Sequence, residues 1–159
     1  MICENVLGNL SEEKYYGYHV DYVDIEWYEA FKKLHKKITS CGVEIGIRLG
    51  NDILTKGLRQ GDVLWCEADE LIAVNIPEAE MIVIEICSEH LHMVPKVCYE
   101  IGNKHAALFY GDTSYQFLTP YNAPTYEMLG KMHGVNVYRN RMKINFDKRI
   151  SASVNAHTH

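Results

Sequence analysis

A change in hydrophobic pattern at residues 77–80 (PEAE) divides this 159-residue chain into two halves that need different folds. In the first half, residues 43–49 (VEIGIRL) place four aliphatic side chains on one face of a strand. The runs at 19–27 and 71–76 also have strand-forming content, and turn residues separate such runs. We therefore predict that residues 1–76 form an all-β domain, either a small sandwich or an open barrel.

The second half alternates strand-like and helix-like segments. Residues 81–86 (MIVIEI) predict a central strand, and apolar residues at three- and four-residue spacing predict a helix from Ser88 to Ile101. Gly102 is expected to end that helix in the left-handed conformation. The elements expected next are a strand at 105–110, a returning strand at 115–119, a helix capped by Asn122 and ended by Gly134, and a last strand at 135–138.

This order of elements, β-α-β-β-α-β, predicts a ferredoxin-like domain at residues 77–147. Residues 148–159 contain small polar side chains without periodicity and are predicted to form a short disordered tail. The whole chain is therefore assigned to the α+β class. One weaker expectation is that residues 26–33 (EWYEAFKK) make a short turn of helix.

Charge and apolar content exclude several kinds of partner. The net charge of −5 argues against nucleic acid, because a nucleic-acid-binding domain usually carries a basic surface. The local basic run at 32–37 (KKLHKK) is interpreted as a solvated strand face, with Leu34 and Ile38 pointing inward. No run of 18 apolar residues occurs, so no membrane span is expected.

The cysteines indicate a reducing compartment. They are odd in number, widely spaced and without a CxxC pair, and the first residues lack the features of a signal peptide. We therefore expect a cytoplasmic protein with free thiols. The five are Cys3, Cys41, Cys66, Cys87 and Cys98.

No catalytic motif is present. The sequence contains no GxSxG, P-loop, GxGxxG or HExxH, and its carboxylates are dispersed. A metal-dependent hydrolase remains an alternative, but it would need a general base beside the metal and an enclosed pocket. A ferredoxin-like regulatory or RNA-binding module is a second alternative, which the acidic net charge and the absence of an RNP-like aromatic motif disfavour.

The histidines are more informative. His157 and His159 form a His-x-His whose side chains point the same way in an extended chain, so both imidazoles can reach one metal ion. The alternative is a tail remnant without a role.

His90 and His92 form a second His-x-His, but on a helix their side chains would point about 200° apart and remain exposed. His133 is expected in the last turn of a helix, where a partly charged imidazole is favourable.

His105 lies in a more distinctive setting, between a predicted helix and a predicted strand. A lone histidine there is more often structural, but Gly102-Asn103-Lys104-His105 resembles the GN[RK]H motif of the urease accessory metallochaperones, the UreE family. Upstream, residues 25–49 followed by 58–64 (LRQGDVL) are similar to that family's N-terminal domain. The resemblance covers roughly residues 5–145.

The resemblance implies a fold and a function. It implies an N-terminal domain like the peptide-binding domain of Hsp40 chaperones, a C-terminal ferredoxin-like domain, and a homodimer formed through the latter. It implies a non-enzymatic carrier of Ni²⁺, which passes the ion to the urease apoprotein by way of an accessory GTPase. In this resemblance His105 is the shared metal ligand at the dimer interface, and His157 and His159 supply further ligands. The same ligands also bind Zn²⁺ or Cu²⁺.

Three departures from the family pattern bear on the metal site. Long polyhistidine tails, found in some members, are reduced here to His-Thr-His at residues 157–159. Lys104 occupies a position where the family usually has arginine. Some members have a His-x-His before the second helix of the domain, where this chain reads Thr-Pro-Tyr-Asn at residues 119–122. A secondary metal site is therefore not expected there, and the capacity for nickel is expected to be low.

Overall fold

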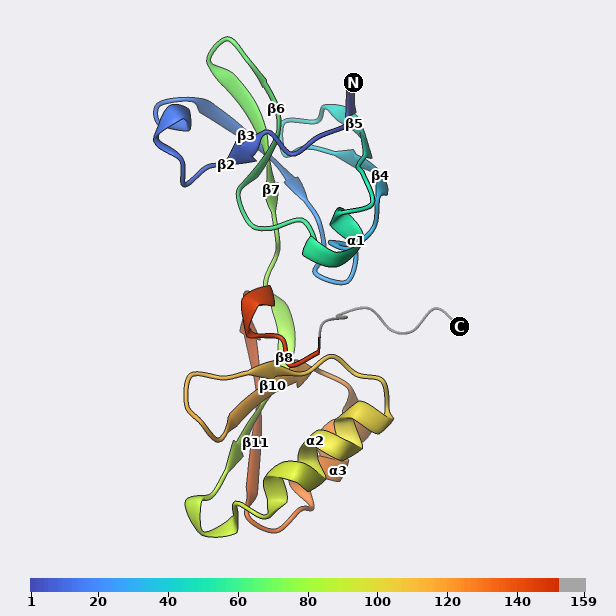
Figure 1. Cartoon of the computed structure of the whole chain (residues 1–159), viewed down its shortest axis with the longest axis vertical. Helices are drawn as coiled ribbons and strands as arrows, with labels where there is room; N and C mark the ends of the chain where they lie inside the picture. Colours follow the sequence, from blue (N-terminus) through green and yellow to red (C-terminus); the bar gives the residue numbers. More distant parts are fainter. Residues whose placement is uncertain (152–159) are drawn as a thin grey trace. The chain divides into compact units, whose positions relative to one another are not determined.

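A computed structural model of the chain describes residues 1–151. The chain forms two compact units, Met1–Pro77 and Glu78–His159, each with its own sheet structure (Figure 1). The first unit is rich in β-strands and the second has the βαββαβ order, which confirms the predicted α+β class. No helix within residues 1–151 has the length and apolar character needed to cross a membrane.

The N-terminal unit contains two sheets. The buried side of β5 (Glu44–Arg48) corresponds to the alternating run found in the sequence, and its Ile45 and Ile47 are each 2% exposed. Residues 26–33 form turns, so the helical turn expected there is wrong. One sheet has the order β1 (Ile2–Cys3), β5 (Glu44–Arg48), β4 (Leu34–Ile38). The other has the order β2 (Gly8–Asn9), β6 (Asp62–Glu67), β7 (Glu70–Asn75), β3 (His19–Asp24), and the unit also holds η1 (Glu13–Tyr15) and α1 (Ile53–Lys56).

Strand β4 faces the opposite way from the prediction. Leu34 is 67% exposed and Ile38 is 63% exposed, whereas His35 and Lys37 lie on the inner face. The pairing with β5 explains this orientation, because His35 lies opposite the buried Ile47 and directly paired side chains share a face. Lys37 is accommodated there because its ammonium group lies 2.6 Å from the carboxylate of Glu29.

The inward position of His35 makes the stability of the protein sensitive to acid. Burial lowers the pKa of His35, although a hydrogen bond to the carbonyl of Lys32 and the charge of Glu29 act in the opposite direction. The unfolded chain then binds a proton more readily than the folded chain. The free energy of unfolding should therefore fall as the pH drops below the ordinary imidazole pKa of about 6.5.

We expect His35→Leu to reduce this acid sensitivity in urea unfolding measured at about pH 7.5 and about pH 5.5, on either side of that pKa. His19→Leu, at an exposed position of β3, is the matched control and should behave as the wild type. An equal loss of stability in wild type and His35→Leu would show that burial of His35 is not the cause.

The C-terminal unit is built on one antiparallel sheet of order β11-β8-β10-β9, which α2 and α3 cover on one face (Figure 1). Strand β8 lies in the middle and contributes Ile82 and Ile84, both fully buried, to a core that includes Val97 and Leu129 from the helices. The elements are β8 (Ala79–Ile86), η2 (Ser88–His90), α2 (Met93–Asn103), β9 (Phe109–Tyr110), β10 (Gln116–Pro120), α3 (Ala123–Gly130), β11 (Val135–Met142) and η3 (Phe146–Lys148).

Helix α3 begins as the sequence predicts and ends earlier. The side chain of Asn122 accepts a hydrogen bond from the backbone N–H of Thr125 at 3.1 Å, and proline occupies the first turn. The helix ends at Gly130, so the predicted end at Gly134 is wrong. Gly134 instead has a left-handed φ of 77° in the loop before β11.

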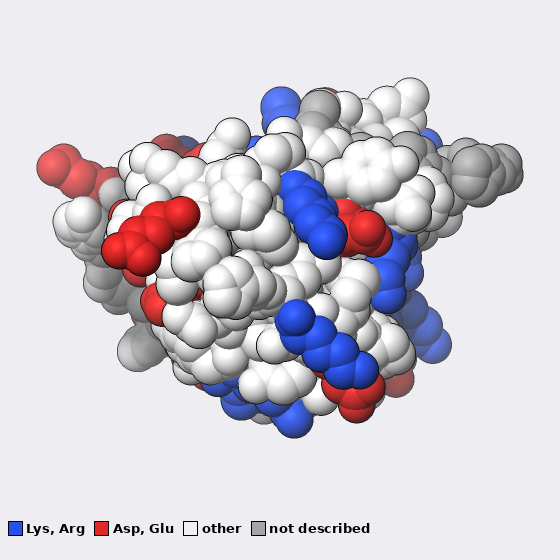
Figure 2. Space-filling model, turned by 90° about the horizontal axis from the view of Figure 1, so that it is seen from below, with Lys and Arg blue, Asp and Glu red and all other residues white. Residues whose placement is uncertain are grey.

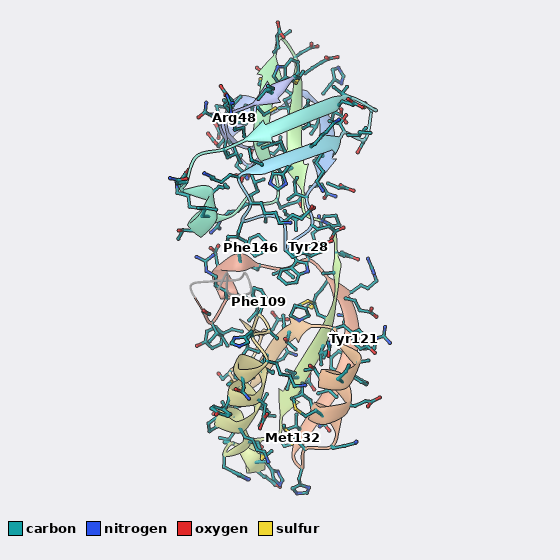
Figure 3. The ribbon with its side chains drawn as sticks, turned by 90° about the vertical axis from the view of Figure 1, so that its right-hand side faces the viewer. Tyr28, Arg48, Phe109, Tyr121, Met132 and Phe146 are labelled. Atoms are coloured by element: carbon teal, nitrogen blue, oxygen red, sulfur yellow. The ribbon has the colours of Figure 1, made fainter. Side chains whose placement is uncertain are left out.

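The end of the described chain returns to the edge strand β9. Phe146 and Phe109 are both buried (Figure 3). Arg149 forms an isolated antiparallel bridge with Phe109, and the backbone N–H of Ile150 donates to the carbonyl of Leu108 at 2.9 Å. The first residues of the predicted tail therefore still contact the C-terminal unit.

Candidate metal centre at His105

The end of helix α2 puts His105 in an uncommon backbone conformation. His105 has a φ of 56°, which lies in the left-handed region that glycine usually occupies. Its backbone N–H donates to the carbonyl of Gly102 at 2.9 Å, and the N–H of Ala106 donates to the carbonyl of Ile101 at 3.3 Å. These two hydrogen bonds define a Schellman motif, with His105 at the position where glycine is most common.

This geometry corrects two predictions. Gly102 does not end the helix, because α2 continues to Asn103 and Lys104 is the C-cap residue. His105 does not begin a strand, because β9 starts only at Phe109. The sequence correctly predicted that the helix ends in this segment, but it predicted the wrong residue for the left-handed conformation. Glycine is the usual residue in that conformation, whereas here a histidine adopts it.

The left-handed conformation has an energetic cost that surrounding contacts must offset. For a residue with a Cβ atom it costs about 1–3 kcal/mol and persists only where neighbouring structure holds it. Here Ile101 is fully buried, and Ala106 packs against the same core. The backbone on both sides of His105 is therefore anchored while its imidazole remains exposed. The backbone therefore fixes the point at which this imidazole leaves the chain, at the end of α2.

The ligands that would complete a site around His105 are not all within the described chain. Among residues 1–151, no group of three or more His, Cys, Asp or Glu side chains is arranged to hold a metal ion. His157 and His159, the other two predicted ligands, lie outside the described residues. The predicted ligand set of His105, His157 and His159 therefore stays a prediction.

Three other histidines lie together in a grouping that the sequence pattern did not predict. His90 and His92 were expected to diverge, but their ring centroids are 5.9 Å apart, and the ring of His133 is 4.6 Å from that of His90. The reason is local, because α2 begins at Met93 and a 3₁₀ turn, η2, precedes it. The paired spacing of His90 and His92 was the only signal in the sequence, and nothing there linked them to His133.

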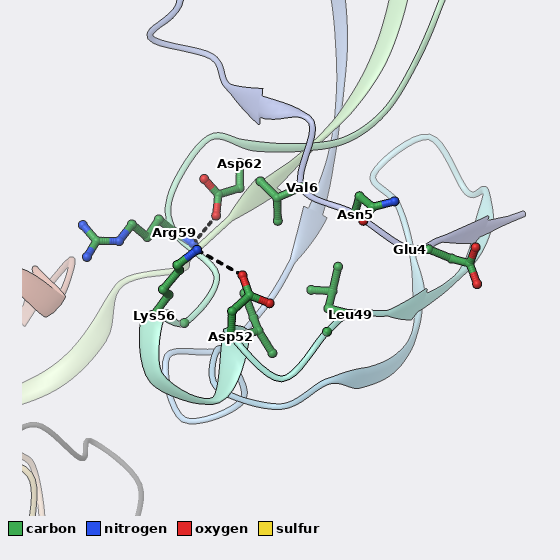
Figure 4. Close-up of a pocket in the computed structure, with 11 residues that line it drawn as sticks. Glu4, Asn5, Val6, Leu49, Asp52, Lys56, Arg59 and Asp62 are labelled. Atoms are coloured by element: carbon green, nitrogen blue, oxygen red, sulfur yellow. Dashed lines mark hydrogen bonds and ion pairs between the residues drawn. The ribbon is translucent and has the colours of Figure 1, made fainter.

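The N-terminal unit contains a polar hollow of about 450 Å³ (Figure 4). Its carboxylates already have partners, since the ammonium group of Lys56 lies 3.1 Å from Asp52 and the backbone N–H of Arg59 donates to Asp62 at 2.8 Å. Burial raises the pKa of Asp62, while its hydrogen bonds act to lower it. No histidine or cysteine lines this hollow, and its carboxylates Asp52 and Asp62 are held by the contacts above.

Comparison with known proteins decides among the alternatives. Residues 3–77 match the family model described as the UreE urease accessory protein, N-terminal domain. A urease accessory protein UreE of Helicobacter pylori strain Shi470 is 43% identical over 154 residues, which cover 97% of this chain and 88% of that protein. The chain belongs to the UreE family.

Two further UreE proteins give the same result. The protein of Helicobacter acinonychis strain Sheeba is 42% identical over 97% of this chain and 88% of its own length. The protein of Acetivibrio thermocellus is 40% identical over 91% of this chain and 89% of its own length. The resemblance found in the sequence is thus confirmed, and with it the expectation of an accessory protein in place of an enzyme.

Proposed function

We propose that this chain is a chaperone that carries Ni²⁺ during the maturation of urease, with His105 as its central metal ligand. Membership of the UreE family supports the task. The observation that supports the residue is the anchored left-handed backbone of His105, which holds an exposed imidazole at the end of α2 against a conformational cost.

The proposed site is shared between two copies of the chain. In a homodimer that forms through the C-terminal domain, each His105 meets its own copy across the two-fold axis. Two imidazoles leave coordination positions open, which suits a protein that must release its ion, whereas a closed four-ligand shell holds the metal permanently. His157 and His159 would supply further ligands, and Zn²⁺ or Cu²⁺ would compete with Ni²⁺ for the same nitrogen atoms.

The same proposal assigns a role to each part of the chain. Residues 77–147 form a ferredoxin-like metal-binding domain, supported by the βαββαβ order and by the sheet order β11-β8-β10-β9. Residues 1–76 form an Hsp40-like domain, and residues 148–159 carry the terminal histidines. The partners are the urease accessory GTPase and the urease apoprotein in the cytoplasm, with no part for nucleic acid or a membrane.

Light scattering combined with a nickel titration tests the shared site. The metal-free protein should have twice the chain mass of 18.3 kDa, and it should bind one Ni²⁺ per dimer at high affinity.

A chain that ends after Ala152 lacks His157 and His159 but keeps every described helix and strand. It should bind the ion more weakly with the same stoichiometry. A metal-free monomer would rule out the shared site, and complete loss of binding on truncation would make the tail the primary site.

A further inference from the structure

A second group of imidazoles lies at the opposite end of helix α2 from His105. His90 and His92 belong to the segment that links β8 to α2, and His133 belongs to the loop that links α3 to β11. The ring of His90 meets that of His133 edge-on, with centroids 4.6 Å apart, and lies 5.9 Å from the ring of His92. Both connecting segments reach the lower end of the C-terminal unit in Figure 1.

Gly134 allows the loops to approach this closely. A Cβ atom at Gly134 would lie 2.4 Å from both Cβ and Cγ of His90, which is closer than any real contact, and the φ of 77° at Gly134 also favours glycine. The backbone N–H of Cys87 donates to the carbonyl of Gly134 at 2.9 Å and fixes the two segments together. The contact between His90 and His133 is thus set by the backbone.

The ring of His90 also has an unsatisfied nitrogen. Its Nδ1 atom is buried and has no hydrogen-bond partner among the described residues. A buried polar group without a hydrogen-bond partner is destabilising, so a ligand that satisfies this atom would be favoured. A bound metal ion satisfies an imidazole nitrogen, and imidazole is a preferred ligand of zinc, copper and nickel.

The ring spacing fits one shared ion. Two imidazoles that bind the same ion through nitrogen atoms about 2.0–2.1 Å from it have ring centres about 5 Å apart. His90 and His133 are already at that separation, and the exposed His92 can approach by rotation of its side chain. As arranged, the described residues offer two imidazoles and no complete set of three ligands, so water would fill the remaining positions.

We propose that His90 and His133, joined by His92, form a second binding site for a divalent ion of the zinc, nickel and copper group. The site is separate from that of His105, because the helix Met93–Asn103 between them is about 16 Å long at 1.5 Å per residue. With few protein ligands it is a weaker site that exchanges its ion readily. Charged side chains of both signs are scattered over this end of the unit (Figure 2), so the imidazoles and not a carboxylate cluster provide the affinity.

The test uses the full-length chain carrying His105→Ala, His157→Ala and His159→Ala together, which removes every ligand of the proposed delivery site. Calorimetric titration of this background with Zn²⁺ and, separately, Ni²⁺ should show one ion per chain. Adding His133→Ala, or His90→Phe to retain a ring at that position, should weaken binding by more than about tenfold. Gly134→Ala should also weaken it, because the new Cβ displaces His90.

His19→Ala in the same background is the matched control, because His19 is an exposed histidine of the N-terminal unit, and it should leave the titration unchanged. Circular dichroism checks that each variant is folded. His133 lies at an exposed position, so His133→Ala still tests the site if His90→Phe fails to fold. Absence of binding in the background, or binding that survives both His133→Ala and His90→Phe, would overturn the second site. Neither result bears on His105, which the background already lacks.

Discussion

Replacing His105 with glycine should remove most of the nickel affinity while making the folded protein more stable. In the proposed dimer two imidazoles would be lost at once, so we expect affinity to fall by more than about 100-fold, beyond the 10–100-fold typical of losing an outer-shell partner. The free energy of unfolding should rise by about 0.5–1 kcal/mol, because glycine relieves the left-handed strain at a φ of 56° by more than it adds to the disorder of the unfolded chain.

His105→Ala separates the two effects. Alanine also removes the ligand, but it keeps a Cβ atom in the left-handed position, so affinity should fall without the gain in stability. His157→Ala and His159→Ala should each weaken binding less than either change at His105. Calorimetry for Ni²⁺ and urea unfolding on the same preparations measure both quantities. Equal affinity losses at all three histidines, or none at His105, would make His105 an ordinary residue at a helix end.

Replacing Ile101 with alanine should destabilise the protein by about 2–5 kcal/mol. Ile101 is fully buried in the C-terminal core, and its carbonyl accepts the N–H groups of Lys104 and Ala106 that close the helix end. The truncated side chain would leave a cavity directly beneath the turn that carries His105. Nickel affinity should therefore fall as well, although no ligand is removed.

Ile101→Val is the matched control, and it should cost only about 0.5–1.5 kcal/mol. Urea unfolding of the two variants, followed by nickel titration under conditions where both remain folded, gives the comparison. A loss below about 1 kcal/mol for Ile101→Ala would mean that the surrounding core collapses onto the gap and that Ile101 does not anchor the helix end.

Local signals in the sequence predicted much of the fold. The alternation at residues 43–49 appears as β5, and the cap at Asn122 begins α3, because both depend on neighbouring residues alone. The βαββαβ order followed from the same kind of pattern.

The orientation of strand β4 and its register with β5 could not be predicted from local spacing. Leu34 and Ile38 have the spacing of an inward strand face, yet the register with β5 turns them outward and brings Lys37 in beside Glu29. That outcome depends on a partner strand and on a carboxylate several residues away, which no local pattern contains. The contact of His90 with His133 is non-local in the same sense.

The sequence motif pointed to His105, whose role as a metal ligand stays a prediction, but it did not predict the backbone geometry there. The motif identified His105, but placing the left-handed residue at Gly102 assumed that glycine would end the helix. The structure shows instead a histidine in the more costly position. A departure from local preference of this kind is expected where function, and not stability alone, selects the residue.

The pairing of β8 with β11 determines the order in which the chain can fold as it leaves the ribosome. The strands of the N-terminal unit end at Asn75, so all of them are made before β8 appears. Strand β8, by contrast, gains one neighbour only when β10 is complete and the other only when residues 135–142 are complete. Until then the apolar run MIVIEI keeps open edges of the kind that pair with other chains. The greatest risk of aggregation through β8 therefore falls during synthesis of the second half, and it ends when β11 pairs with the second edge of β8.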